Sequence, residues 1–131
     1  MNLQIYTDGG SKGNPGPSSI GILIKSPDGE IQRYREDIGI ATNNVAEYTA
    51  VIRAYDLIKK LDRDITGISF YSDSQLIVRQ LSGMYKVKNP AMKSLVNQVK
   101  ERELALGIPV TYTSVPREEN SIADGLVNGV I

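Results

Sequence analysis

Four acidic residues stand where their side-chain oxygens could carry out chemistry. Asp8 follows the alternating run LQIYT, and Asp73 follows the β-branched and aromatic run ISFYS. Glu47 lies near the start of an amphipathic segment, and Asp124 lies in ENSIADGL near the end of the sequence. The chain contains neither histidine nor cysteine. Because no imidazole or thiolate is available, hydrolytic chemistry here must use carboxylates, hydroxyls, lysines or a bound metal.

Each of these acids also has a purely structural interpretation. Asp8 precedes two glycines and could close an Asx-turn, whereas Asp73 precedes Ser74 and could cap a helix. Asp124 could be a solvated acid on a helix. Glu47 could simply lie favourably near a helix N-terminus, although it heads an apolar stripe of 3.6-residue period and so points toward the core. An uncompensated buried charge there would cost several kcal/mol.

Together the acids favour a metal site. If the strands that end at Asp8 and Asp73 are neighbours in one sheet, their carboxylates leave adjacent strand ends, and the helix start that carries Glu47 can lie over the same edge. Two carboxylates about 4 Å apart repel by about 4 kcal/mol at an effective dielectric constant of about 20, which raises pKa values. A divalent ion would relieve this repulsion. Ligands that are all oxygen favour Mg²⁺ or Mn²⁺, and bridging carboxylates can hold two such ions.

The elements that must position these residues follow from hydrophobic periodicity and turn signals. In chain order we expect strands over 3–7, 18–25 and 31–38, a helix over 42–61, a strand over 65–72, helices over 72–83 and 90–107, a strand over 109–114 and a helix over 120–131. This order, βββ-α-β-αα-β-α, predicts an α/β fold with a five-stranded mixed sheet flanked by helices, in which three antiparallel strands precede parallel additions. A chain of 131 residues suits one domain over 1–131.

The charge and hydropathy patterns limit the classes of function. The formal net charge is zero, yet the segment from Ser74 to Lys100 has no acidic residue and several basic ones. This segment is either a solvated helix face or a surface that contacts phosphates. The first residues lack a signal-peptide pattern, and no apolar run approaches membrane-spanning length. We therefore expect a soluble, cytoplasmic protein without a membrane partner.

Four motifs in order, YTDGGSKGNPGP, TNNVAEYTA, SFYSDSQLIVRQLSGMYKVKN and VPREENSIAD, cover nearly the whole chain. In these motifs the chain resembles the type-one ribonuclease H family, in its compact microbial form without a separate hybrid-binding domain. The resemblance implies endonucleolytic cleavage of the RNA strand of RNA–DNA hybrids, giving 5′-phosphate and 3′-hydroxyl ends. It also implies that Asp8, Glu47, Asp73 and Asp124 are catalytic and hold two Mg²⁺ or Mn²⁺ ions, one activating the attacking water and the other stabilising the leaving oxygen.

The resemblance extends to contacts with the substrate. Positions implied to meet the minor groove of the hybrid, including RNA 2′-hydroxyls, are Gly10, Ser11, Asn14, Asn43, Asn44 and Gln75. Thr42 matches a contact to a DNA phosphate. The glycines after Asp8 would let the sugar-phosphate backbone approach closely. Asn43 and Asn44 could alternatively serve as helix caps.

Three departures from the family pattern change what we expect. The chain has no tryptophan, and the segment that would form a basic protrusion offers Tyr85, Lys86, Lys88 and Lys93, so hybrid binding should be weak and salt-sensitive. Arg117 or Glu118 occupies a loop where many relatives carry a histidine. Arginine cannot act as a base near neutral pH, so an auxiliary role for Arg117 would use phosphate or product contacts. Glycines near the end of the sequence should let the last helix fray.

Two alternatives to a hybrid nuclease remain open at this point. One is a catalytically weak or silent module that binds hybrids or structured RNA. The other is a related nuclease on the same fold with other substrates, such as double-stranded RNA. Retention of all four acids argues against a silent module, because binding alone gains nothing from negative charge placed beside phosphates. We expect a monomer with no obligatory protein partner.

Overall fold

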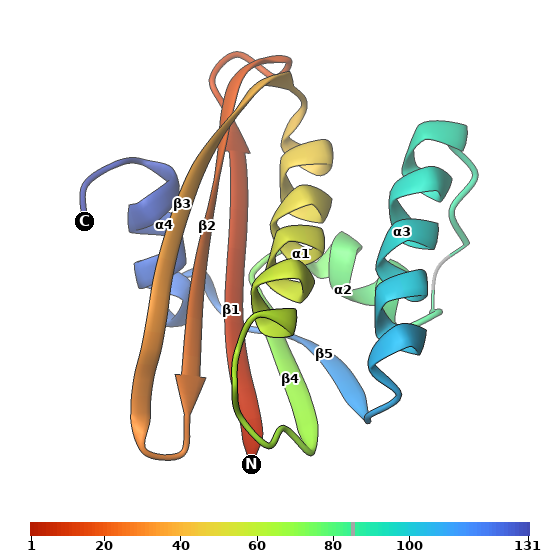
Figure 1. Ribbon diagram of the computed structural model, residues 1–131. Coiled ribbons are helices and arrows are strands. Elements are labelled where there is room, and N and C mark those ends of the chain that lie inside the picture. Colours follow the sequence, from red (N-terminus) through yellow and green to blue (C-terminus); the bar gives the residue numbers. More distant parts are fainter. Residues whose placement is uncertain (85) are drawn as a thin grey trace.

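A computed structural model describes residues 1–84 and 86–131 of the chain (Figure 1). In chain order the elements are β1 (Asn2–Ser11), β2 (Gly16–Ser26), β3 (Gly29–Ala41), α1 (Asn43–Lys59), β4 (Gly67–Ser72), α2 (Gln75–Leu81), α3 (Pro90–Leu106), β5 (Val110–Ser114), a 3₁₀ turn η1 (Arg117–Asn120) and α4 (Ser121–Val127). The order of strands and helices expected from the sequence is confirmed. Tyr85 lies outside the described residues.

The five strands form one mixed sheet with the order β3-β2-β1-β4-β5. β1 pairs with β2 and β2 with β3 in antiparallel fashion, whereas β1–β4 and β4–β5 are parallel. The turn between β2 and β3 contains Pro27 and Asp28 and ends at Gly29, whose φ of 132° favours glycine. The parallel pairs follow from helical crossovers, because a parallel neighbour cannot be reached through a tight turn.

Helices cover both faces of the sheet (Figure 1). The hydrophobic core lies on the face that α1 covers, where α1 packs its apolar stripe on side chains of β1, β2 and β4, with α2 and α3 adding to the cluster. α4 lies on the opposite face (Figure 1). Side chains alternate between the faces, so Leu3 and Ile5 of β1 are fully buried in the core while Gln4 and Tyr6 point to the other side and are half-buried.

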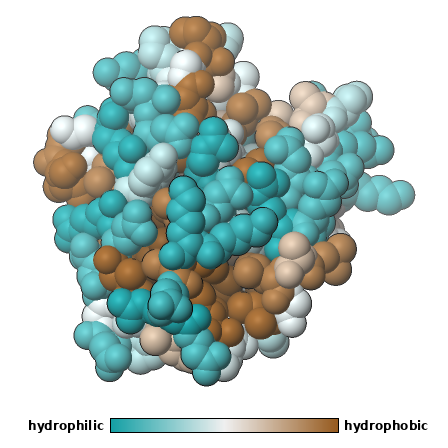
Figure 2. All heavy atoms as spheres, in the orientation of Figure 1, coloured by the Kyte–Doolittle hydropathy of each residue, from teal (hydrophilic) through white to brown (hydrophobic). Residues whose placement is uncertain are grey.

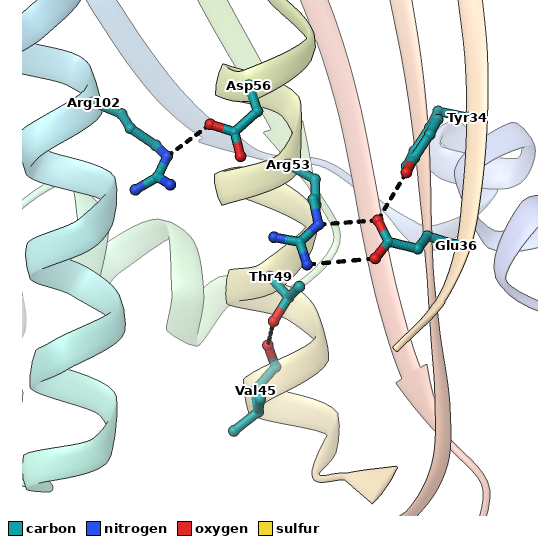
Figure 3. A network of polar contacts seen from close by, with 7 residues as sticks. All are labelled: Tyr34, Glu36, Val45, Thr49, Arg53, Asp56 and Arg102. Atoms are coloured by element: carbon teal, nitrogen blue, oxygen red, sulfur yellow. Dashed lines mark hydrogen bonds and ion pairs between the residues drawn. The ribbon is translucent and has the colours of Figure 1, made fainter. Parts of the chain in front are cut away.

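A chain of polar contacts fixes α1 between β3 and α3 (Figure 3). On one side, Arg53 donates to Glu36 of β3 at 2.9 Å, and the Tyr34 hydroxyl donates to the same carboxylate at 2.8 Å. On the other side, Arg102 of α3 donates to Asp56 at 3.0 Å. Partly exposed ion pairs of this kind add about 0–1 kcal/mol each, so they orient the helix more than they stabilise it.

The structure corrects several expected boundaries. β1 does not stop at the glycines but continues to Ser11, because Gly9, Gly10 and Ser11 pair with β2. The last helix ends at Val127 rather than at residue 131, and η1 precedes it. Asn43 and Asn44 are not caps, since Thr42 caps α1 by accepting the Val45 N–H at 3.2 Å.

The surface carries few large exposed apolar side chains in the described ranges. Ile40 at the end of β3 and Val130 near the C-terminus are each about three-quarters exposed. Figure 2 shows hydrophobic atoms at the top of the view, at the left, where the C-terminal end lies, and across the lower part, with hydrophilic atoms between these areas. Within residues 1–84 and 86–131, none of the helices has the length and apolar character needed to cross a membrane.

Candidate active site

Two aspartates of the site leave neighbouring parallel strands. The β1–β4 ladder ends with Tyr6 opposite Tyr71, and two residues further along the chain stand Asp8, still within β1, and Asp73, just after β4. Parallel strands end at the same edge of a sheet, which is where ligand sites of α/β folds form. The helix that follows β4 is capped by Ser74, whose hydroxyl accepts the Ile77 N–H. Asp73 is therefore not the cap, and its carboxylate is left for another role.

Glu47 reaches this edge because α1 lies unusually close to β1. A Cβ atom on Gly9 would overlap the Ala46 carbonyl group and lie 2.5 Å from the Glu47 nitrogen. Only glycine fits there, and the Gly9 N–H donates to Glu47 Oε1 at 2.6 Å. Gly9 therefore allows close contact between β1 and α1. The sequence had suggested a different reason for a glycine after Asp8, namely room for the sugar-phosphate backbone of the substrate.

Asp8, Glu47 and Asp73 bring carboxylate oxygens within 4.8 Å of one another. Asp8 is only 8% exposed. Burial, followed by the negative charge of Asp73, raises the pKa of Asp8 to about 7. Burial and the neighbouring Asp8 charge raise the pKa of Glu47 well above its ordinary value. The rise expected for an empty carboxylate cluster is confirmed, and the site requires a proton or a cation to balance its charge.

This donor set fits a hard divalent cation. The three groups offer only oxygen atoms, they come from β1, from α1 and from the loop after β4, and their mutual repulsion falls when a cation binds between them. Histidine and cysteine are absent from the whole sequence, which removes the ligands that favour softer metals. The cluster could therefore hold a metal ion.

Asp124 faces the same cleft from the other side of the sheet. It lies outside the group of three, but its charge contributes to the raised pKa of Asp8. Its Oδ1 accepts from Arg117 Nη2 at 3.4 Å, and the Arg117 side chain is 76% exposed. Asp124 thus lies near the cluster but is not one of its three members, and Arg117 lies beside Asp124.

The acids line an open cleft of about 630 Å³. Predicted residues that share its lining are Asp8, Gly10, Ser11, Asn43, Asn44, Glu47, Asp73, Arg117 and Asp124. The predicted contacts outside this lining are Asn14, Thr42, Gln75, Lys86 and Lys88. Lys86 and Lys88 are exposed in the segment between α2 and α3, and Gln75 is exposed at the first residue of α2.

Asn14 joins the site through hydrogen bonds between the predicted contact residues. Its Oδ1 accepts the Asn43 N–H at 2.9 Å, and Asn43 Oδ1 accepts the Ser11 N–H at 2.8 Å. The Ser11 hydroxyl donates to the Ala41 carbonyl at 2.8 Å. These bonds hold the β1–β2 loop against the start of α1, so both amide side chains have fixed positions at the rim of the cleft.

Sequence reasoning missed two basic residues of the cleft lining, Lys12 and Arg35. Lys12 lies inside the first glycine-rich motif, so its position in that motif was an available signal. Arg35 lies in the middle of β3, an edge strand with alternating charges, where nothing in the pattern distinguishes it from its neighbour Arg33. Only the tertiary structure identifies it.

The sheet order, the helices on both faces and the acids beside the end of the β1–β4 ladder define an α/β protein with a ribonuclease H fold. The family model for RNase H matches residues 1–128, and the chain belongs to the RNase H family. It is 41% identical over 128 residues to Ribonuclease HI of Halobacterium salinarum and 40% identical over 131 residues to the bifunctional protein Rv2228c of Mycobacterium tuberculosis.

These alignments cover 96% and 98% of this chain but 62% and 35% of the two relatives, so the chain spans only part of their length. Among solved structures, RNase H1 of Halobacterium salinarum has a TM-score of 0.89 at 36% identity, covering 99% of this chain and 97% of that one. LC11-RNase H1, solved in complex with an RNA/DNA hybrid, has a TM-score of 0.88 at 38% identity, covering 98% and 96%. The predicted fold class and family are confirmed.

Proposed function

We propose that this chain is a metal-dependent endoribonuclease that hydrolyses the RNA strand of RNA–DNA hybrids and leaves 5′-phosphate and 3′-hydroxyl ends. The observation that carries the proposal is the convergence of Asp8, Glu47 and Asp73 within 4.8 Å in a chain of the RNase H family. The hybrid complex of the related LC11-RNase H1 supports the choice of substrate.

Asp8, Glu47, Asp73 and Asp124 would hold two ions, Mg²⁺ or Mn²⁺. When bound, these ions would supply the Lewis acidity and the activation of water that phosphodiester hydrolysis needs. The protein's own contribution is orientation. Glu47 is held by the Gly9 N–H, and Asp8 is fixed within a strand, so the carboxylates do not have to reorganise when charge is neutralised.

We assign the discrimination of RNA from DNA to the amide side chains near the cleft. Asn14 and Asn43 each use Oδ1 in a bond to a backbone N–H, which leaves their Nδ2 groups to donate to a 2′-hydroxyl. Gly10, Ser11, Asn44 and Gln75 would add minor-groove contacts, and Thr42 a contact to a DNA phosphate. Lys86 and Lys88 would bind the hybrid through its phosphates.

The test is incubation of the protein with an end-labelled hybrid in Mg²⁺, Mn²⁺ or EDTA. We expect cleavage of the RNA strand that requires a divalent ion and disappears in Asp8→Asn while hybrid binding is retained. Asp28→Asn makes the same chemical change in an exposed turn and should leave cleavage intact. Cleavage in EDTA equal to that in Mg²⁺ would refute the metal-dependent account.

The same assay separates the two alternatives. Hybrid binding without cleavage in either metal would favour a silent binding module, and equal cleavage of double-stranded RNA would favour a broader substrate range. We further propose that residues 1–131 form one domain and that it acts as a monomer. Light scattering during size exclusion checks the monomer, because a dimer would have twice the 14.3 kDa mass.

A further inference from the structure

The helix that carries Asp124 is too short to be stable alone. α4 spans seven residues, Ser121–Val127, and includes Gly125. Isolated helices of fewer than about 12 residues are marginal in water, and a glycine weakens them further. Asn120, at its N-cap, makes no side-chain capping bond to the helix. The position of Asp124 must therefore depend on contacts between α4 and the sheet.

Two side chains from the sheet donate hydrogen bonds to carbonyl groups at the C-terminal end of α4. Arg35 of β3 donates from Nε to the Leu126 carbonyl at 2.8 Å, and its Nη1 lies 2.9 Å from Asp37 Oδ1. Ser19 of β2, only 8% exposed, donates its hydroxyl to the Val127 carbonyl at 2.7 Å. The last carbonyls of a helix lack partners within it, and a cation placed there also balances the helix dipole.

The N-terminal end of α4 is attached to the strands beside Asp8. The buried Asn120 amide donates to the Thr7 carbonyl at 2.9 Å. A Cβ on Gly21 would overlap the Ala123 carbonyl oxygen, so α4 lies directly on β2. Gly21 is the residue that pairs with Asp8 across the ladder. The N-terminal end of the helix is thus attached to β1, the strand that carries Asp8, and to its neighbour β2, whereas the C-terminal end is attached to β2 and β3.

We propose that Arg35 and Ser19 are positioning residues for Asp124. They hold the C-terminal end of α4 on the sheet, and this keeps the Asp124 carboxylate facing the cleft. The proposal rests on the proposed function for its kinetic consequences, but its structural part can be measured without turnover. It also gives contacts that would hold a helix with a glycine at position 125 on the sheet, where the sequence alone predicts fraying.

The first test is amide hydrogen exchange of the whole chain. The amides of Asn128, Gly129 and Val130 donate to carbonyls of α4 and report on its last turn. Arg35→Met removes the donor but keeps much of the apolar stem, and should speed exchange of these amides at least about tenfold while α1 and β4 are unchanged. Arg33→Met removes the same charge two residues away on the same strand and should leave them protected. Unchanged exchange in Arg35→Met would overturn the proposal.

The second test measures whether the effect passes through Asp124. Arg35→Met should lower kcat by about tenfold with little change in KM, because it disturbs a carboxylate rather than a substrate contact. In an Asp124→Asn background the same substitution should have no further effect. Arg35→Lys keeps a donor and should lower kcat less than Arg35→Met, and Ser19→Thr, which keeps its hydroxyl, should lower it less than Ser19→Ala. Equal losses in both backgrounds, or a loss confined to KM, would show that Arg35 acts on the substrate itself.

Calorimetric titration with Mn²⁺ separates failure of this proposal from failure of the proposed function. If Arg35 positions Asp124, Arg35→Met and Asp124→Asn should weaken Mn²⁺ affinity to a similar extent. The double variant should bind Mn²⁺ no more weakly than either single variant. This result is expected whether or not the protein cleaves hybrids. Mn²⁺ affinity reduced by Asp124→Asn but unchanged by Arg35→Met would overturn the positioning role alone.

Discussion

The buried carboxylate of Asp8 predicts an unusual pH dependence of stability in the absence of metal. Its pKa rises from an ordinary value of 3.8 to about 7 in the folded protein, because the charged form is buried beside Asp73. The folded state therefore holds a proton that the unfolded state releases, and stability must fall as pH rises between these two values. The full rise corresponds to about 4 kcal/mol, of which about 3 kcal/mol is lost between pH 5 and pH 8. Glu47 acts in the same direction.

The assay is urea unfolding in EDTA at pH 5 and pH 8 for the wild type, Asp8→Asn and Asp28→Asn. Asp8→Asn removes the titrating group, so it should be more stable than the wild type at pH 8, with a much smaller difference at pH 5. Asp28→Asn should follow the wild type at both pH values, since Asp28 is exposed. Mg²⁺ should stabilise the wild type at pH 8 and have little effect on Asp8→Asn. A metal-free wild type that is more stable at pH 8 than at pH 5 would refute the reasoning.

Three further substitutions test other parts of the structure. Gly9→Ala forces the Ala46 backbone away from β1 and should lower stability by at least about 1–3 kcal/mol in thermal unfolding, whereas Gly10→Ala meets only a Val127 methyl at 3.1 Å and should cost much less. Arg117→Gln should reduce kcat/KM less than about tenfold, because an exposed ion pair is weak, and should leave the pH profile unchanged. Replacing Lys86 and Lys88 by alanine should raise KM and flatten its salt dependence at constant kcat.

Each of these substitutions has a control or a contrary result. Equal melting temperatures for the two glycine variants would contradict the close approach of α1 to β1. A pH profile that shifts in Arg117→Gln would mean that the guanidinium affects a titrating group in the reaction. The control for the lysine pair is the replacement of Lys59 and Lys60 by alanine. It removes the same charge at the C-terminal end of α1, away from the end that carries Glu47, and should leave KM unchanged. A fall in kcat at saturating hybrid would contradict a pure binding role for Lys86 and Lys88.

Local patterns were enough to predict the order of strands and helices, and to place Asp8 and Asp73 together on the condition that their strands are neighbours. The helix before ISFYS indicated a parallel strand, and the structure supplies the missing condition, because β1 and β4 pair directly. The apolar stripe of α1 likewise pointed Glu47 inward, and its residues Ala50 and Ala54 are fully buried. These inferences succeeded because periodicity and connection handedness are properties of contiguous segments.

The parts that could not be predicted depend on contacts between distant segments. Asp73 looked like a helix cap until the structure gave that role to Ser74. The reason for Gly9 lies in Ala46, 37 positions further on, and the anchoring of α4 by Arg35 joins residues separated by 91 positions. An arginine in an edge strand has many possible partners, so its contact with a helix terminus leaves no local signature.

The glycines at positions 9 and 21 place α1 and α4 in backbone contact with the sheet on its two faces. At these two points the main chain of each helix consequently touches the main chain of a strand, with no side chain between them. Efforts to move either helix relative to the sheet would have to begin at these glycines, where an added methyl group would overlap the backbone of the helix.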